Sequence, residues 1–247
     1  MLFQMCYGPE LEVIYKSIKK APGIDVIRLC ENYQYSDEGD ISSLIESALV
    51  ILEDLKFIRK DGKGFVPIEN VEWNLKMVFV RLQQIAREKT GTEESMNYIF
   101  ASLYEQIFVK PDKMFSANIH YQVNSKFSKT LVGHEKVNAW KRIMECWGLG
   151  QRAYSGFYAL PQITLIQEII EDSGEWEGGL HPFCEKYIDP VLPCITLDGN
   201  IFKGIIFSLI ALHEKGCLRL SYKQDLPYKS YGSNNEWNWI KLVKKVG

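Results

Sequence analysis

The segment that decides the fold is ISSLIESALVILEDLKFIRKDGKGFVP, residues 41–67. Its first half repeats apolar residues at spacings of three and four, which predicts a helix with a wide apolar face. Asp40 stands just before this helix, where an aspartate can cap the free amides of the first turn. Residues 57–60 then read as a strand, 61–64 as a tight turn, and 65–66 as the returning strand. The segment therefore predicts one helix followed directly by one hairpin.

Two shorter helices are predicted upstream, over residues 9–20 and 24–32, with Pro22 between them. Three helices and a hairpin within the first 68 residues resemble the winged helix-turn-helix superfamily. This resemblance implies that the third helix and the hairpin are the elements that approach nucleic acid. A plain helical subdomain with a β-ribbon is the alternative interpretation.

The same order of elements recurs near the end of the chain. Helices are predicted at 163–172, 180–188 and 201–215, and strands at 217–222 and 236–242. Helices at 73–88, 93–109 and 133–147 lie between the two sets. We therefore expect a mainly α fold with small β-hairpin wings, in which two winged-helix modules, 1–68 and 153–247, flank a helical middle segment, 69–152. The two modules share order and not sequence, so the tandem arrangement rests on architecture.

Composition narrows the class of protein. The chain has 247 residues, 46% of them hydrophobic, and a formal net charge of −2. A net charge this small supplies no overall attraction for nucleic acid, so any such partner needs a local basic patch. No apolar run approaches the roughly 18 residues that span a bilayer, and the first residues lack the layout of a signal peptide. We expect a cytoplasmic protein with no membrane partner.

No catalytic or metal-binding motif is present. The six cysteines are scattered without a C-x-x-C pair, and the four histidines form no H-E-x-x-H pattern. Neither G-x-S-x-G nor a phosphate-binding glycine loop occurs. We expect a non-enzymatic protein with no cofactor and no metal site.

Charge along the chain locates the candidate interface. The outer face of the helix in residues 41–55 has three carboxylates and no Lys or Arg, and the helix at 201–215 is apolar nearly all round. Neither helix is typical of a base reader. Residues 110–142 instead have seven Lys and Arg against two acidic residues, with aromatic residues interleaved. The predicted nucleic-acid-binding residues are Arg59, Lys60, Lys63, Lys126, Lys129, Lys141, Arg142, Lys223 and Lys229. The predicted partner-binding residues are Tyr228, Tyr231 and Trp237.

These patterns favour a DNA-associated winged-helix subunit that contacts the nucleic-acid backbone through its wings and its basic middle segment, with weak sequence specificity. Its layout is loosely similar to small accessory proteins of bacterial DNA-modification and phage-defence systems. The alternative is a scaffold subunit of a larger ATPase or defence complex. In architecture, the layout of this chain resembles the tandem winged-helix subunits of chromosome-organising ATPase complexes. That subunit would bind other proteins, or a second copy of this chain, without touching DNA.

Overall fold

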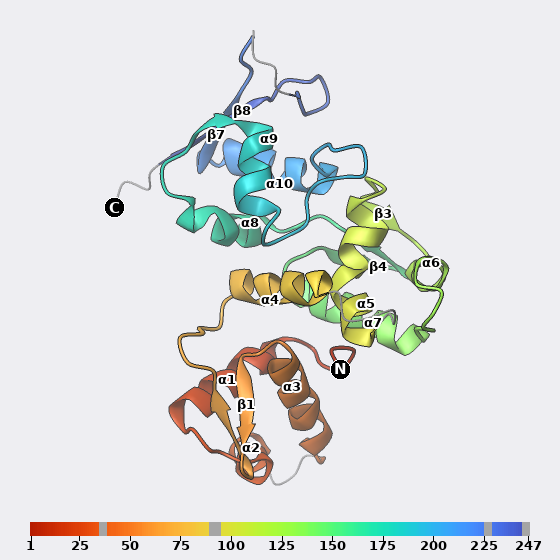
Figure 1. Cartoon of the computed structure of the whole chain (residues 1–247), viewed down its shortest axis with the longest axis vertical. Helices are drawn as coiled ribbons and strands as arrows, with labels where there is room; N and C mark the ends of the chain where they lie inside the picture. The colour runs from red at the N-terminus through yellow and green to blue at the C-terminus, as the bar shows by residue number, and fades with distance from the viewer. Residues whose placement is uncertain (35–38, 89–94, 225–228, 244–247) are drawn as a thin grey trace. The chain divides into compact units, whose positions relative to one another are not determined.

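The computed structural model of the chain (Figure 1) describes residues 1–34, 39–88, 95–224 and 229–243. The chain divides into two units, Met1–Ala101 with Phe127–Trp147, and Ser102–Lys126 with Gly148–Gly247. Helices alternate with antiparallel sheets of two or three strands, so the fold is mainly α with small β elements, as predicted. Parts of the expected middle segment fall in both units, and the three-segment division stays a prediction.

The first unit begins with the predicted helices and hairpin. These elements are α1 (Pro9–Lys20), α2 (Val26–Tyr33), α3 (Ser42–Asp54), β1 (Ile58–Asp61) and β2 (Gly64–Pro67). In Figure 1, α1, α2 and α3 surround the hairpin. Tyr15, Phe57 and Trp73 form a ring cluster in its core, with centroids 4.9 to 6.2 Å apart. The unit continues with α4 (Leu75–Arg87), the start of α5 (Met96–Tyr104), and α7 (His134–Cys146).

The start of α2 differs from the prediction. Ile24, expected inside the helix, pairs with Phe65 of β2 in an antiparallel bridge. The Phe65 amide donates to the Ile24 carbonyl at 2.9 Å, and the Gly23 amide donates to the Phe65 carbonyl at 2.8 Å. Asp25 then caps α2 by accepting from the Arg28 amide at 2.9 Å. The hairpin is thus tied to the α1–α2 connection by a short third strand segment.

The second unit contains more strand than predicted. Its elements up to residue 158 are the π-helical turn η1 (Glu105–Val109), β3 (Phe115–Ser116), α6 (Ile119–Lys126), β4 (Gln151–Ala153) and β5 (Gly156–Tyr158). Its remaining elements are α8 (Ile163–Ile170), η2 (Glu171–Ser173), β6 (Glu177–Gly179), α9 (Leu180–Phe183), the π-helical turn η3 (Cys184–Ile188), α10 (Lys203–Glu214), β7 (Leu218–Ser221) and β8 (Trp239–Leu242). They form two three-stranded sheets, ordered β3-β5-β4 and β6-β8-β7.

The strand β6 lies between the helices predicted at 163–172 and 180–188, where no strand was predicted, and two of its three residues are glycines, which have low strand propensity. It pairs with β8 in the register Glu177↔Lys241 to Gly179↔Trp239. Ile24 precedes α2 and pairs with β2, and β6 precedes α9 and pairs with β8. In both cases the final strand of the hairpin lies between its two partners. The elements α1 to β2 and α8 to β8 therefore follow one common order of helix, short strand, helix, helix and hairpin (Figure 1).

Gly64 provides a test of the tie between the hairpin and the α1–α2 connection. A Cβ at Gly64 would lie 2.0 Å from the Gly23 carbonyl oxygen, inside a backbone pairing that cannot shift without breaking. We expect Gly64→Ala to destabilise the first unit by about 3 kcal/mol. The control is Gly62→Ala, which meets no atom within 4 Å and suffers only from a φ of 59°, at about 1 kcal/mol. Thermal unfolding followed by circular dichroism measures both, and equal melting temperatures would show that this pairing contributes nothing.

Candidate nucleic-acid interface

The β1–β2 hairpin displays three cations on a small rigid support. Arg59 and Lys60 lie on β1, and Lys63 lies in a two-residue turn in which Gly62 has a φ of 59°. A positive φ at the first of two turn residues is the pattern of a type II′ turn, which takes glycine there. All three cationic side chains are exposed, and within the described ranges none enters an ion pair. The hairpin therefore offers its charges to an external anion.

The helix α3, which precedes this hairpin, presents a different chemistry. Its exposed residues are Ser43, Glu46 and Glu53, while Ile45, Ala48, Leu49, Ile51 and Leu52 are buried. The outer face is therefore polar and acidic, as predicted from the sequence. Carboxylates facing phosphates are unfavourable, so affinity for a nucleic-acid backbone has to come from the hairpin and not from this helix.

The predicted basic residues of the middle segment fall in both units. Lys126 ends α6 in the second unit, whereas Lys129, Lys141 and Arg142 belong to the first unit. Lys126 and Lys129 are exposed. Lys141 is only 7% exposed, and its inclusion among the phosphate-binding residues is corrected because a buried ammonium cannot reach a phosphate. The Arg142 guanidinium lies 4.5 Å from the centre of the Tyr7 ring, a cation–π contact that occupies it within the unit.

The sheet β6-β8-β7 carries a second cationic surface, part of which the sequence analysis missed. Arg219 of β7, Lys241 of β8 and Glu177 of β6 lie opposite one another on one face of the sheet. Lys241 pairs with Glu177 at 2.6 Å, and this hydrogen bond lowers the pKa of Glu177. The alternation of Leu218, Arg219 and Leu220 was the available signal, since the two leucines are buried and the arginine is exposed.

Lys223, one of the predicted nucleic-acid-binding residues, lines the same groove as Arg219 and Lys241. Its ammonium lies 5.2 Å from the Trp239 ring centre, and its backbone is held by Asn238, which is buried. The Asn238 side chain accepts from the Lys223 amide at 2.8 Å and donates to the Lys223 carbonyl at 2.9 Å. This shallow groove is lined by Glu177, His213, Arg219, Lys223, Trp239 and Lys241, among others. Its lining includes three cations, Arg219, Lys223 and Lys241, and one carboxylate, Glu177.

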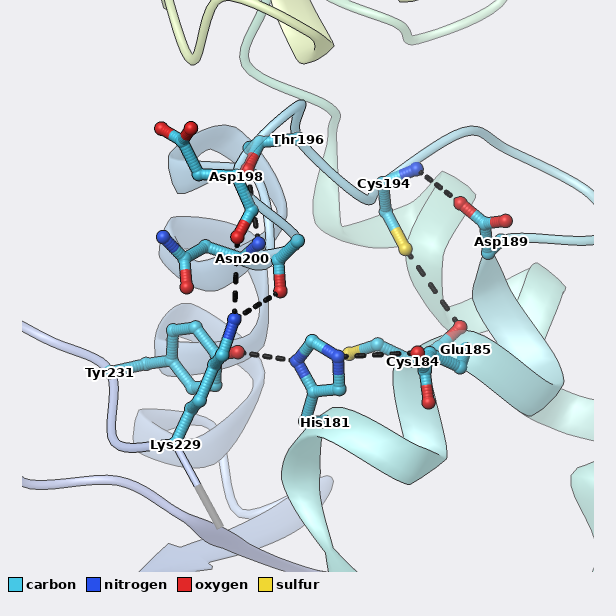
Figure 2. A network of polar contacts seen from close by, with 11 residues as sticks. His181, Cys184, Glu185, Asp189, Cys194, Thr196, Asp198, Asn200, Lys229 and Tyr231 are labelled. Carbon is cyan, nitrogen blue, oxygen red and sulfur yellow. Dashed lines mark hydrogen bonds and ion pairs between the residues drawn. The ribbon is translucent and has the colours of Figure 1, made fainter.

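Lys229, Tyr231 and Trp237, the predicted residues described between β7 and β8, make contacts within the unit. Figure 2 shows Lys229 aimed at the loop before α10, where its ammonium donates to the carbonyls of Gly199 at 2.7 Å and Asp198 at 3.4 Å. Tyr231 is 8% exposed, and burial raises the pKa of its hydroxyl. The Tyr231 hydroxyl bonds Nδ1 of His181, whose Nε2 lies 3.3 Å from a Glu185 carboxylate oxygen.

These contacts correct two of the assigned roles. Tyr231 is too buried to be a partner-binding residue, and Lys229 ties its own loop to the body of the unit. Trp237 pairs with Tyr231 through its backbone and lies 5.2 Å from the His213 ring, so its half-buried indole packs under the ribbon. Tyr228 lies outside the described residues.

Comparisons with known proteins supply no family: no family model, no curated protein and no solved structure matches the chain. Within the described ranges, none of the helices combines the length and the apolar character that crossing a membrane requires. In the same part of the chain, no three His, Cys, Asp or Glu side chains gather as a metal ion would need.

Proposed function

We propose that this chain is a non-enzymatic, DNA-associated protein of the tandem winged-helix type, an accessory subunit that contacts the duplex backbone. The common order of α1 to β2 and of α8 to β8 supports the two winged-helix modules, because each places its last strand centrally and ends in a hairpin. The observation that carries the function is the β1–β2 hairpin, with Arg59, Lys60 and Lys63 exposed and without ion pairs among the described residues.

The chemistry of these side chains indicates the mode of binding. Lys and Arg at a hairpin tip contact phosphates, which carry no sequence information. The acidic outer face of α3 lacks the Arg, Lys, Asn or Gln that reads base edges. Binding should therefore be weakly dependent on sequence and strongly dependent on salt. The groove of Arg219 and Lys223 is the second expected contact.

The test is a salt titration of duplex binding by the Lys60→Ala/Lys63→Ala variant. Each phosphate contact contributes roughly −0.9 to the slope of log K against log salt, so losing two should flatten the slope by about 1.8. Fluorescence anisotropy with duplexes of two unrelated sequences measures the slope and the affinity, and both duplexes should weaken alike.

The matched control is Lys16→Ala/Lys20→Ala, which removes the same charge from exposed positions of α1 in the same unit. Its slope should equal that of the wild type, because charge alone, away from the hairpin, makes no contact. Equal slopes for both double variants would refute the hairpin contact. Failure of the wild-type protein to bind either duplex at low salt would refute the proposed function itself.

The scaffold alternative is favoured by one feature of α10. Ile205, Ile206, Leu209 and Leu212 are buried, as expected for an apolar helix, but Phe207 is 53% exposed. A large exposed aromatic side chain on a helix is an anchor for a protein partner. A wild-type protein that does not bind DNA, and that loses a co-purifying subunit on Phe207→Ala, would establish this second function.

A further inference from the structure

The small sheet β3-β5-β4 has an exposed aromatic face that the proposed function does not use. Phe115 of β3, Tyr158 of β5 and Gln151 of β4 lie opposite one another and therefore on the same face. Phe115 is 40% exposed and Tyr158 is 46% exposed, while their partners in the next row, Ser116 and Phe157, are buried. We name Phe115, Tyr158 and Gln151 the aromatic platform.

The two rings pack against each other. Their centroids are 4.5 Å apart with an interplanar angle of 34°. Gly156 makes this arrangement fit, since a Cβ there would lie 2.8 Å from the Phe115 ring. The Phe115 ring therefore lies directly over the backbone of β5. Exposed aromatic side chains on one face of a small sheet are a device by which proteins stack the bases of single strands.

Tyr154 lies at the tip of the β4–β5 hairpin. Its side chain is fully exposed, and its φ is 53°, a left-handed conformation that is uncommon for residues other than Gly, Asn and Asp. The turn is held by the Ser155 hydroxyl, which donates to the Ala117 carbonyl at 3.2 Å. A bulky aromatic at a position that local structure would give to glycine or asparagine is therefore a candidate for a role in binding.

Charge selects the kind of partner. The segments that build the platform, residues 113–126 and 148–160, contain Lys113, Lys126 and Arg152 and no Asp or Glu. The nearest acidic residue in sequence, Asp112, is neutralised by Lys203 at 2.9 Å. Exposed rings in segments that contain cations and no carboxylate match a polymer of planar bases and phosphates. A typical protein surface would bring both signs of charge.

We propose that the aromatic platform, together with Tyr154, binds single-stranded nucleic acid by base stacking. Bases stack on the exposed sides of Phe115 and Tyr158, and Lys113, which is exposed two residues before Phe115, contacts phosphate. The inference goes beyond the proposed function, because it requires neither the β1–β2 hairpin nor a duplex.

A measurement on the wild-type protein tests it without any variant. Fluorescence anisotropy compares a labelled dT12 strand with an abasic strand of equal length and charge. Stacking predicts at least tenfold weaker binding of the abasic strand. Equal affinities would mean that only phosphates are bound, and no binding of dT12 would overturn the proposal outright.

Variants then locate the site. Phe115→Ala/Tyr158→Ala should weaken dT12 binding by about tenfold or more, while Tyr158→Phe keeps it, because stacking needs the ring and not the hydroxyl. Tyr154→Asn should fold at least as well as the wild type, since asparagine tolerates positive φ, and should also bind more weakly. Tyr222→Ala, an exposed tyrosine beyond the end of β7, is the control.

Duplex binding, measured in parallel, separates this proposal from the previous one. The platform variants should leave duplex affinity unchanged. Unaltered dT12 affinity in both Phe115→Ala/Tyr158→Ala and Tyr154→Asn would contradict the platform, whatever the duplex result. If the protein does not bind dT12 and instead binds another protein through this face, the proposal is overturned and the platform is a protein-binding site.

Discussion

Replacing Leu209 with Asp in α10 is expected to unfold the second unit at room temperature. Leu209 is completely buried where α10 packs on α8 and β7. Removing its side chain forfeits about 2 kcal/mol of apolar burial, and an uncompensated carboxylate adds several kcal/mol of desolvation. The sum, about 5 kcal/mol or more, equals the whole stability of many natural domains.

Phe207→Asp is the matched control, because it places the same charge on the same helix at a position that faces solvent. Thermal and urea unfolding followed by circular dichroism should show a near-normal transition for Phe207→Asp and a lost transition for Leu209→Asp. If both variants melt like the wild type, α10 is not part of a packed core. If Phe207→Asp folds normally but no longer binds DNA or a protein partner, the exposed face of α10 at Phe207 has a binding role.

Trp140→Ala should produce the second-largest loss, in the first unit. Trp140 lies in α7, is completely buried, and donates from Nε1 to the Phe100 carbonyl of α5 at 3.1 Å. Truncating a buried tryptophan costs about 3–5 kcal/mol, because the cavity does not close fully. The contact joins two helices that are 40 residues apart in sequence, so α7 should lose its attachment to α5.

Trp140→Phe separates the two contributions. It retains most of the apolar volume and loses the hydrogen bond, so it should cost about 1–2 kcal/mol beyond the small change in packing. Urea unfolding measures all three proteins. An equal loss for Phe and Ala would show that the hydrogen bond dominates, and no loss for either would contradict the packing of α7 described above.

Local pattern predicted most of the helices and the first hairpin. Residues 9–20 form α1 as expected, because the spacing of Leu11, Ile14 and Ile18 and the following Pro22 are local signals. The bridge of Ile24 to β2 and the strand β6 were missed for a physical reason. Ile24 and β6 have partners 41 and more than 50 residues away, and no periodicity over one to three residues announces such a pairing.

The candidate interface divides in the same way. The exposure of Arg59, Lys60 and Lys63 follows from the local turn sequence at residues 61–64. The position of this hairpin was predicted correctly, and its role in binding stays a prediction. Lys141, Lys229 and Tyr231 are residue types that usually lie at the surface. Their contacts here are made with segments that are distant in the sequence. The loop at Asp198 and Gly199 receives Lys229, and His181 of α9 receives Tyr231.

The sequence by itself determined the helical class, the tight hairpin at Gly62, and the acidic outer face of α3, since each depends on residues within one or two turns of one another. Only the tertiary structure decided which cations stay in solvent and that Phe115 and Tyr158 meet on one sheet. Those outcomes depend on strand register, and register is set by hydrogen bonds between β3 and β5, whose paired residues are about 40 positions apart.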